Sequence, residues 1–408
     1  MRIAFISYEF PPDTGKGGIG TYVQQIAGAM AANGNEVHVF AGSNYREGSD
    51  DSNGFIVHRI KCVNGDDFRG KVVLVFGEQN AIAPFDVIES PEINGNAWEV
   101  KKTFTNIPLV VRLHAPNYLV ESLKKTYIPF TAKLRFILGS LKRFRFDLGY
   151  WRPYDKMLDP DYHFIQLANN ISAPSAAMKN WAVKNWKIAP DKITVVPNIF
   201  FPSQDLLDIP INEKTNYNRV VFFGRLNVLK GLVNATKAMQ NILVQNPEWQ
   251  FRVIGDDGPG PNNHICMKEW MQKELKEVGS QVEFLNGMAY EDLPAAISDS
   301  EIVLLPSLFE SFSYTCAEAM AAGRAVVGSN NAGMADLIEN NKSGVLINPY
   351  SFREITGALQ KLILDNQFRY QLSINARESI LIKQNAAKTV HLFQEYYCNI
   401  IENKLVEN

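Results

Sequence analysis

Short apolar runs alternate with helical patterns along most of the chain. The first run, residues 2–7 (RIAFIS), is typical of a buried parallel strand, and residues 18–33 then have the spacing of an amphipathic helix that ends at Gly34. Similar runs predict further strands at 37–43, 55–60, 86–90, 109–114, 171–175, 193–198, 219–226, 251–257, 282–288, 301–306 and 324–329. Alternation of this kind predicts mostly parallel, doubly wound α/β sheets.

The pattern is interrupted at residues 198–218, where two prolines and the lack of periodicity indicate a linker. We therefore expect one α/β domain over 1–200 and a second over 215–382, followed by a helical segment over 383–408. The length of 408 residues agrees with this division, because it is too long for one ordinary core.

Composition excludes some classes of function. The net charge of −2 gives no global attraction for nucleic acid. The four cysteines, Cys62, Cys266, Cys316 and Cys398, form no C-x-x-C pair, as expected for reduced thiols in the cytoplasm. The chain enters a strand directly, without the layout of a secretory signal, and we find no long stretch that is apolar and uncharged. We therefore expect a globular cytoplasmic protein without a membrane span.

Two carboxylates flank a predicted strand-to-helix junction in the second domain. Glu310 lies in the turn after a buried strand, and Glu318 lies in the first turn of the small-residue helix that follows. Open α/β sheets bind ligands at such junctions, and the backbone N–H groups of Ser313 to Thr315 would suit a phosphate or a polar sugar. Alternatively, Thr315 and Glu318 form a capping box and Glu310 is an ordinary loop carboxylate.

The spacing of the two glutamates resembles the E-x7-E signature of the retaining glycosyltransferases of family 4, which have the GT-B fold. This resemblance implies two facing Rossmann-like, doubly wound parallel-sheet domains with a cleft between them. The first domain would lie on the acceptor side, the second would bind the nucleotide-sugar, and the last helix would dock back on the first. Glu310 would be catalytic and would hold the donor sugar with Ser311 and Phe312, and Glu318 would bind the ribose.

Glycines and cations match further motifs of the same family. Gly224-Arg225 ends a predicted strand, and Lys230-Gly231 follows at the start of a helix, where two cations could neutralise a pyrophosphate. The resemblance assigns the donor diphosphate to Gly17, Gly18, Arg225, Lys230, Ser313, Tyr314 and Thr315.

The glycine-rich loop of the first domain also fits another motif. Gly15-x-Gly17-x-x-Gly20 has the spacing of a dinucleotide fingerprint, but a loop separates it from its strand and the next strand ends without a carboxylate for a ribose. A plain tight turn is the alternative to the role in phosphate binding.

His114 ends the predicted strand 109–114, at the edge of the sheet where sites form. The resemblance places it as a catalytic residue against the sugar–phosphate linkage, whereas the residue alone suggests a histidine that merely ends a strand. After the second carboxylate the family usually has Gly-Gly and a glutamate, but this chain has Asn331 to Asp336 there, which leaves the role of Asp336 open.

Residues 119–147 form a basic amphipathic segment within an insertion expected at 119–165. One interpretation is a solvated helix that packs on the domain through its apolar stripe. The other is a surface that contacts anionic lipid at the inner face of the membrane, near a lipid-carried acceptor. Asp159-Pro160-Asp161, which follows, is interpreted as a turn. The cations of the segment are Lys124, Lys125, Lys133, Arg135, Lys142, Arg143 and Arg145.

Together these motifs predict a retaining glycosyltransferase that moves a sugar from a nucleotide-sugar, with UDP- or GDP-sugar as the expected donor. The acceptor would be a glycan or a lipid-linked sugar in polysaccharide or glycolipid biosynthesis. We expect no metal and no other cofactor, because Arg225 and Lys230 can neutralise the departing diphosphate. The alternatives are a nucleotide-sugar epimerase or hydrolase of the same fold, a non-catalytic nucleotide-binding protein and, least supported, an NAD-dependent dehydrogenase.

Overall fold

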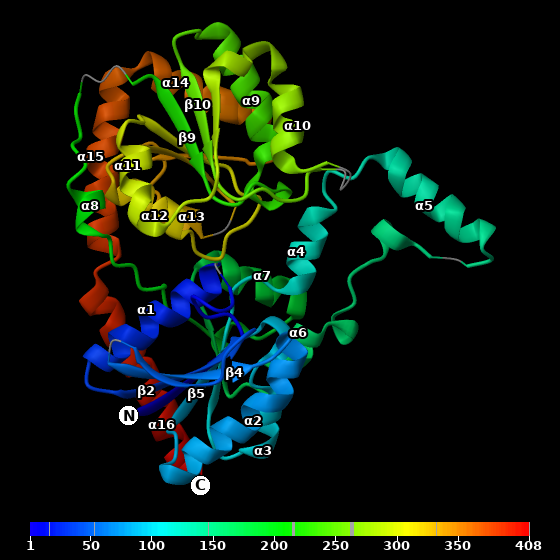
Figure 1. Ribbon diagram of the computed structural model, residues 1–408, viewed down its shortest axis with the longest axis vertical. Coiled ribbons are helices and arrows are strands. Elements are labelled where there is room, and N and C mark those ends of the chain that lie inside the picture. Colours follow the sequence, from blue (N-terminus) through cyan, green and yellow to red (C-terminus); the bar gives the residue numbers. More distant parts are fainter. Residues whose placement is uncertain are drawn as a thin grey trace. The chain divides into compact units, whose positions relative to one another are not determined.

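The computed structural model describes residues 1–15, 17–52, 54–145, 147–213, 217–261, 265–331 and 333–407. These residues form two compact α/β units (Figure 1). Unit 1 contains residues 1–117, 155–201 and 384–408, and unit 2 contains residues 118–154 and 202–383. The start predicted for the second domain, residue 215, lies outside the described residues.

Unit 1 is built on an eight-stranded sheet with the order β3-β4-β2-β1-β5-β6-β7-β8. Its neighbouring strands are parallel except for β3, which pairs antiparallel with β4 at one edge. The central strands consist mainly of buried residues, most of them apolar, as expected for strands covered on both faces. The strands are β1 (Arg2–Ser7), β2 (Glu36–Ser43), β3 (Gly48–Ser52), β4 (Phe55–Lys61), β5 (Val87–Pro91), β6 (Leu109–Arg112), β7 (Asn170–Ala173) and β8 (Ile193–Val195).

The core of unit 1 includes side chains from the far end of the chain. Phe393 and Tyr397 of α16 are fully buried in the same cluster as residues of β1 and α1. The helices and short 3-10 turns are α1 (Gly18–Ala32), α2 (Gly65–Ile82), η1 (Ile93–Gly95), α3 (Trp98–Thr103), η3 (Lys156–Leu158), α6 (Pro160–Ile165), α7 (Ala176–Trp186), η4 (Pro190–Lys192) and α16 (Ala386–Glu407).

Unit 2 is built on a six-stranded, fully parallel sheet with the order β11-β10-β9-β12-β13-β14. Helices α9 and α14 pack against each other beside this sheet, and α12 packs against α15. The strands are β9 (Arg219–Phe223), β10 (Gln250–Ile254), β11 (Val282–Leu285), β12 (Ile302–Leu305), β13 (Ala325–Ser329) and β14 (Val345–Ile347). The helices and 3-10 turns after β8 are α8 (Gln204–Leu207), η5 (Val228–Lys230), α9 (Leu232–Gln245), α10 (Met267–Glu274), η6 (Lys276–Gln281), η7 (Tyr290–Asp292), α11 (Leu293–Ser298), α12 (Tyr314–Ala321), α13 (Met334–Leu337), α14 (Phe352–Leu364) and α15 (Asn366–Lys383).

The basic segment differs from the insertion expected in the first domain. Residues 118–154 group with unit 2, because Leu123 and Tyr127 pack against the hydrophobic core of that unit. The Tyr127 hydroxyl also accepts a hydrogen bond from Asn234 Nδ2 of α9, at 2.9 Å. The segment contains α4 (Asn117–Lys124), α5 (Phe130–Lys142) and η2 (Gly149–Trp151).

Asp159 and Asp161 do not form the isolated turn that was expected. The Asp159 side chain accepts a hydrogen bond from the Asp161 N–H at 2.9 Å and caps α6, which starts at Pro160. Proline is favoured at this first helical position, because its missing N–H would have no partner within the helix. The two aspartates therefore start a helix.

Candidate active site

Lys230 and Glu310 meet at the carboxyl end of the unit 2 sheet. Lys230 ends η5, which follows β9, and Glu310 lies in the loop between β12 and α12. Lys230 Nζ donates a hydrogen bond to Glu310 Oε1 at 2.5 Å, and both side chains are partly exposed. The structure therefore brings together a cation and a carboxylate that the sequence had placed in separate motifs.

The close approach of the two loops depends on a glycine. Gly231 follows Lys230 with a φ of 71°, and a Cβ atom there would lie 1.8 Å from the carbonyl oxygen of Pro306. Only glycine adopts this backbone conformation at low cost, and a side chain would push the two loops apart. The Asn227 side chain accepts a hydrogen bond from the Lys230 N–H at 3.2 Å and fixes the start of η5.

Hydrogen bonds on both sides position Glu310. Ser307 Oγ donates to Glu310 Oε1 at 2.9 Å, and the Gly333 N–H donates to the Glu310 carbonyl oxygen at 2.7 Å. Asn331 Nδ2 donates to the carbonyl oxygen of Leu308 at 2.7 Å. Asn331 and Gly333, which lie where the chain departs from the family pattern, therefore support the Glu310 loop. Asp336 is exposed on α13, one helix further along the chain.

Glu318 is not part of a capping box. Ser313, rather than Thr315, caps α12, and its hydroxyl oxygen accepts a hydrogen bond from the Cys316 N–H at 3.2 Å. Glu318 consequently lies in the second turn of α12 rather than the first. Its side chain is buried, and this burial raises the pKa of Glu318 to about 7. A carboxyl group removed from water in this way is typical of a functional position, although burial alone does not prove one.

The other predicted residues of unit 2 surround this pair of loops. Arg225 is exposed and forms no ion pair with any residue that the structure describes. Phe312 is buried, with its ring against the edge of the Tyr314 ring at a centroid distance of 5.0 Å. Thr315 and Ser311 are half-buried. The start of α12 thus lies directly after the loop that carries Glu310.

His114 lies at the carboxyl end of the unit 1 sheet and is held by Glu92. The backbone N–H of His114 donates to both carboxylate oxygens of Glu92, at 2.9 Å each. His114 Nδ1 lies 3.1 Å from the carbonyl oxygen of Arg112, which can only accept, so Nδ1 carries the hydrogen in the neutral ring. Nε2 is then an acceptor, and it is buried without a hydrogen-bond partner among the described residues.

The glycine loop of unit 1 ends at an uncapped helix. Gly17 is the N-cap of α1 in an extended conformation, no side chain caps this helix, and its first turn has no acidic residue. A Cβ atom at Gly18 would meet no protein atom within 4 Å. Steric crowding by the described chain therefore does not explain glycine at position 18, whereas the close approach of a ligand would.

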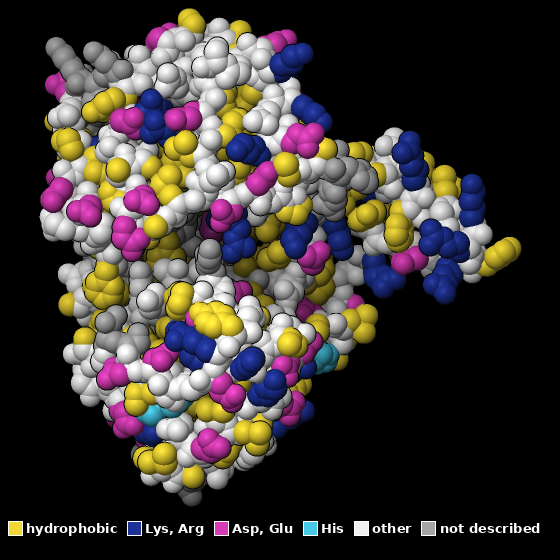
Figure 2. Space-filling view, viewed as in Figure 1, with side chains coloured by type: hydrophobic (Ala, Val, Ile, Leu, Met, Phe, Trp, Pro, Cys, Tyr) yellow, Lys and Arg dark blue, Asp and Glu magenta, His cyan; other side chains and the backbone are white. Residues whose placement is uncertain are grey.

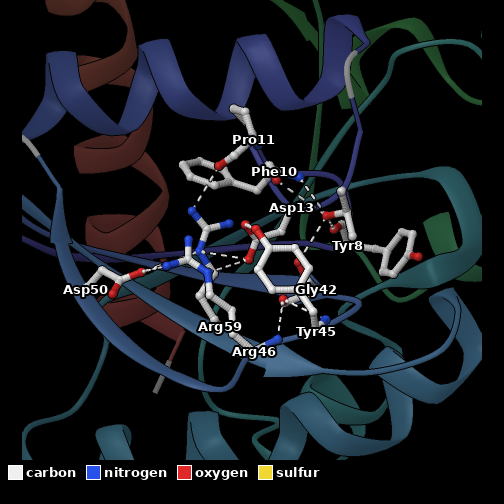
Figure 3. Close-up of polar contacts among 11 residues, drawn as sticks. Tyr8, Phe10, Pro11, Asp13, Gly42, Tyr45, Arg46, Asp50 and Arg59 are labelled. Atoms are coloured by element: carbon white, nitrogen blue, oxygen red, sulfur yellow. Dashed lines mark hydrogen bonds and ion pairs between the residues drawn. The ribbon is translucent and has the colours of Figure 1, made fainter.

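A network of charged side chains holds the middle of the same loop (Figure 3). Asp13 is buried and receives hydrogen bonds from Tyr45 and Arg46, which follow β2. Arg59 of β4 donates to the Pro11 carbonyl oxygen at 2.9 Å. The loop between β1 and α1 is therefore bonded to the neighbouring strands of its sheet.

Three contacts of the site were absent from the sequence-based prediction. Glu92 directly follows β5, and Ser307 lies two residues after β12. Their positions at the carboxyl ends of buried strands could have indicated from the sequence that they belong to the site. Tyr290 shows no such signal. Burial raises the pKa of Tyr290 to about 12, and the charge of Glu318 contributes to this rise.

Helix α5 presents a surface of mixed chemistry (Figure 2). None of its residues is buried, and its exposed apolar side chains lie among lysines and arginines. Among the described residues, no helix has the length and apolar character required to cross a bilayer. The exposed apolar side chains of α5 are Phe130, Leu134, Phe136, Leu138 and Leu141.

Family profiles match nearly the whole chain. The family described as "Glycosyl transferases group 1" matches residues 204–379, and the family described as "Glycosyltransferase Family 4" matches residues 16–200. An uncharacterized glycosyltransferase of Methanocaldococcus jannaschii is 22% identical over 97% of this chain and 98% of its own length. A D-inositol 3-phosphate glycosyltransferase of Corynebacterium glutamicum is 29% identical over 53% of this chain and 54% of its own length.

The fold agrees with that of solved glycosyltransferases. Sucrose-phosphate synthase of Thermosynechococcus elongatus superposes with a TM-score of 0.75 over 98% of this chain and 99% of its own, at 20% identity. The prediction of two parallel-sheet α/β domains with the GT-B fold is confirmed. The matched profiles and this fold together show that the chain belongs to the group 1 glycosyltransferases of the GT-B fold.

Proposed function

We propose that this glycosyltransferase transfers a sugar from a nucleoside-diphosphate sugar with retention of configuration at the anomeric carbon. The observation that supports this most is the Lys230–Glu310 ion pair, with Glu318 on the helix that follows. A diphosphate cation, a sugar-binding carboxylate and a ribose-binding carboxylate are then gathered at one edge of one sheet. This edge is where open α/β sheets bind nucleotides.

In this proposal the diphosphate binds Arg225 and Lys230. Charge-assisted hydrogen bonds to phosphate are stronger than neutral ones, and the exposed guanidinium of Arg225 is available for them. The start of α12, at Ser313, Tyr314 and Thr315, adds the positive end of a helix dipole. Gly17 and Gly18 of unit 1 supply backbone N–H groups to the same diphosphate.

The two carboxylates have separate roles in the proposed reaction. Glu310, with Ser311 and Phe312 beside it, accepts hydrogen bonds from hydroxyls of the donor sugar and favours the positive charge that develops on the ring. Glu318 accepts hydrogen bonds from the ribose hydroxyls, a role that suits a carboxylate on a helix next to the sugar loop. His114 presents Nε2, an acceptor without a protein partner among the described residues, to the sugar near its bond to phosphate.

The proposed chemistry is an exchange on one face of the sugar. The bond between the anomeric carbon and the diphosphate oxygen breaks, and the acceptor oxygen forms a bond to that carbon. The departing phosphate oxygen takes the proton of the acceptor hydroxyl, so no covalent bond to Glu310 is required. Arg225 and Lys230 stabilise the charge of the leaving diphosphate, and we therefore propose that no metal ion is needed.

The donor and the acceptor follow from chemistry and from related proteins. We propose a UDP- or GDP-sugar as the donor and a glycan or a lipid-linked sugar as the acceptor, in polysaccharide or glycolipid biosynthesis. The name of the C. glutamicum relative includes a phosphorylated polyol acceptor, D-inositol 3-phosphate. This supports a hydroxyl-bearing acceptor that also carries a phosphate.

Helix α5 supports peripheral contact of a cytoplasmic protein with anionic lipid. Its cations can bind lipid headgroups, and its exposed apolar side chains can enter the interfacial region of the bilayer. This interpretation is favoured over a helix packed on the domain, because α5 buries none of its residues.

A thermal-shift screen followed by product analysis tests the proposal. The full chain is heated with UDP, GDP and ADP and with their glucose, mannose and N-acetylglucosamine conjugates. A ligand at about 100 times its dissociation constant adds about 2.7 kcal/mol of stability, which is easily measured. The donor that stabilises the protein is then incubated with acceptors, and NMR of the product reports the anomeric configuration. Inversion would overturn retention, and conversion of the donor without any acceptor would indicate an epimerase or a hydrolase instead.

A further inference from the structure

Asp13 is a buried carboxylate in the loop between β1 and α1 that has no role in the proposed reaction. Its side chain is 0% exposed. The Tyr45 hydroxyl donates to Asp13 Oδ1 at 2.5 Å, and Arg46 Nε donates to Oδ2 at 2.8 Å. Arg59 Nε lies 3.8 Å from the same Oδ2 (Figure 3). Groups from the connection between β2 and β3 and from β4 thus converge on one residue of the loop.

Other bonds restrain the residues on either side of Asp13. Arg59 Nη2 donates to the carbonyl oxygen of Pro11 at 2.9 Å, and the guanidinium of Arg59 lies over the Phe10 ring at 4.9 Å. Thr14 Oγ1 lies 2.5 Å from the carbonyl oxygen of Tyr8 and 3.0 Å from that of Gly42, and its single hydrogen can be donated to either. The loop is therefore attached to β2 and β4 at several consecutive positions, immediately before it reaches Gly17 and Gly18.

The carboxylate is essential to the charge balance of this network. Burial raises the pKa of Asp13, but hydrogen bonds from Arg46, Tyr45 and Ser43, together with the charge of Arg59, outweigh burial and hold this pKa at about 2. Asp13 is consequently ionised throughout the neutral range. Without its charge, the buried Arg59 would keep, among the residues that the structure describes, only Asp50, at 3.8 Å, as a carboxylate partner.

We propose that Asp13 is a positioning residue that holds the loop in the conformation in which Gly17 and Gly18 receive the donor diphosphate. This inference rests on the proposed function. A loop that is already ordered before the ligand arrives loses little conformational entropy on binding, so affinity for the phosphate group is greater. Asp13 itself contacts neither phosphate nor sugar and acts through Arg46 and Arg59.

Asp50 provides a matched control. It is paired with the same arginines, with Arg46 Nη1 at 3.1 Å, but it lies on β3, is 46% exposed at its side chain and makes no bond to any described residue of the loop. In full-length protein, Asp13→Asn should weaken binding of UDP, GDP and ADP by about tenfold in calorimetry, with binding of the nucleosides unchanged. Asp50→Asn should change the affinity for the nucleoside diphosphates and for the nucleosides by less than about twofold.

The kinetic readout separates positioning from mere stability. Asp13→Asn should raise the donor KM and leave kcat at saturating donor nearly unchanged, because the loop still reaches its conformation once the donor is bound. Amide hydrogen exchange in peptides covering Glu9–Gly18 should be faster in Asp13→Asn without nucleotide and should slow when nucleotide is added. A lower melting temperature with unchanged nucleotide affinity would assign Asp13 a purely structural role and overturn the inference.

A milder variant keeps the test decisive if Asp13→Asn does not fold. Tyr45 is 61% exposed, so Tyr45→Phe removes one hydrogen bond to Asp13 with little risk to the core. It should weaken nucleoside diphosphate binding by about threefold, and unchanged binding would overturn the inference. If the wild type binds none of UDP, GDP and ADP, the proposed function fails and the inference fails with it. If the wild type binds and the variants bind equally well, only the inference fails.

Discussion

Lys230 and Glu310 form an ion pair, with Nζ 2.5 Å from Oε1, across 80 positions of the chain. Without ligand, each group neutralises the other. In the proposed reaction the two have different partners, because Lys230 binds the diphosphate and Glu310 binds the sugar. Binding of the donor therefore replaces the Lys230–Glu310 contact with two contacts to the donor, one from each side chain. A free nucleoside diphosphate provides a partner for Lys230 but no sugar for Glu310.

Removal of the Glu310 charge should strengthen the binding of free nucleoside diphosphate. Glu310→Gln releases Lys230 from its carboxylate partner, and a partly exposed pair of this kind contributes up to about 1 kcal/mol, or roughly a fivefold change in affinity. Calorimetry with UDP, GDP and ADP measures this change. Arg225→Ala is the opposing comparison, since it should weaken binding of the same ligands by about 1.5–3 kcal/mol and leave nucleosides unaffected. If Glu310→Gln binds the diphosphates more weakly than the wild type, Glu310 and the diphosphate do not compete for Lys230.

Glu310 and Glu318 should differ in their kinetic effects. The ribose does not react, so Glu318→Gln should mainly raise the donor KM. The sugar ring gains positive charge as the diphosphate leaves, so Glu310→Gln should mainly lower kcat, by about 100-fold for a lost electrostatic contact in the transition state. Full kcat in Glu310→Gln, or a glycosylated Glu310 trapped by mass spectrometry, would refute these roles.

Donor binding should depend on pH through Glu318. Burial raises the pKa of Glu318 to about 7. In the proposed reaction the ribose hydroxyls donate hydrogen bonds to the ionised form of this carboxyl group. Donor affinity should therefore increase as pH rises from about 6 to about 8, by at most tenfold per unit. Glu318→Gln should flatten this dependence, which calorimetry at several pH values can measure.

The same group makes an opposite contribution to the stability of the free protein. Because the pKa of Glu318 is raised by burial in the folded chain, the folded state binds more protons than the unfolded state between about pH 4.5 and pH 7. Stability contributed by this group should fall as pH rises through that range. The melting temperature of Glu318→Gln should accordingly exceed that of the wild type by the largest amount above pH 7. An equal gain at pH 4 would contradict the assignment.

Gly18→Ala should leave the fold intact and weaken the binding of diphosphate. A Cβ atom at Gly18 meets nothing within 4 Å, and alanine favours the helix by about 0.4–1 kcal/mol, so the melting temperature should stay the same or rise. The added methyl group would occupy the space proposed for the phosphate. Gly70→Ala in α2, where a Cβ atom also meets nothing, is the matched control and should bind nucleotide normally. If Gly18→Ala binds nucleoside diphosphate normally, Gly18 does not contact the diphosphate.

The basic segment should bind anionic vesicles. Each cation close to such a surface contributes about 1 kcal/mol, so reversal of charge at Lys142, Arg143 and Arg145 should release the protein in a flotation assay. Lys273→Glu on α10 changes an exposed cation outside the segment and should not matter. If the wild type fails to float with anionic lipid at low salt, the segment has no role at the membrane.

Contiguous apolar runs made most of the fold predictable. The strands of both sheets lie within a few residues of their predicted positions, because buried parallel strands need such runs. Two strands were not predicted, the short β14 (Val345–Ile347) and β3. Strand β3, with the sequence GSDDS, pairs antiparallel with β4 although its residues are polar. It lies at the sheet edge, where one side remains open to water, so it carries no apolar signature.

Local motifs in the sequence pointed to the candidate site residues, but not to the contacts between them. Lys230 and Glu310 were each recognised from a local motif, yet their ion pair depends on the packing of Gly231 against Pro306, which no local pattern shows. The same reason explains the grouping of residues 118–154 with unit 2. That grouping depends on Leu123 and Tyr127, two side chains of ordinary appearance in the sequence.

The burial of α16 in unit 1 determines the order in which the chain can fold during synthesis. Phe393 and Tyr397 fill the core of unit 1, but they follow the whole of unit 2 in the sequence. Domains usually complete themselves in order as they leave the ribosome. Here the first sheet is made early, but its core lacks Phe393 and Tyr397 until α16 has been made. The second unit, whose residues end at 383, can close before the first. The first unit therefore cannot complete its hydrophobic core until α16 has been made, although its sheet comes first in the sequence.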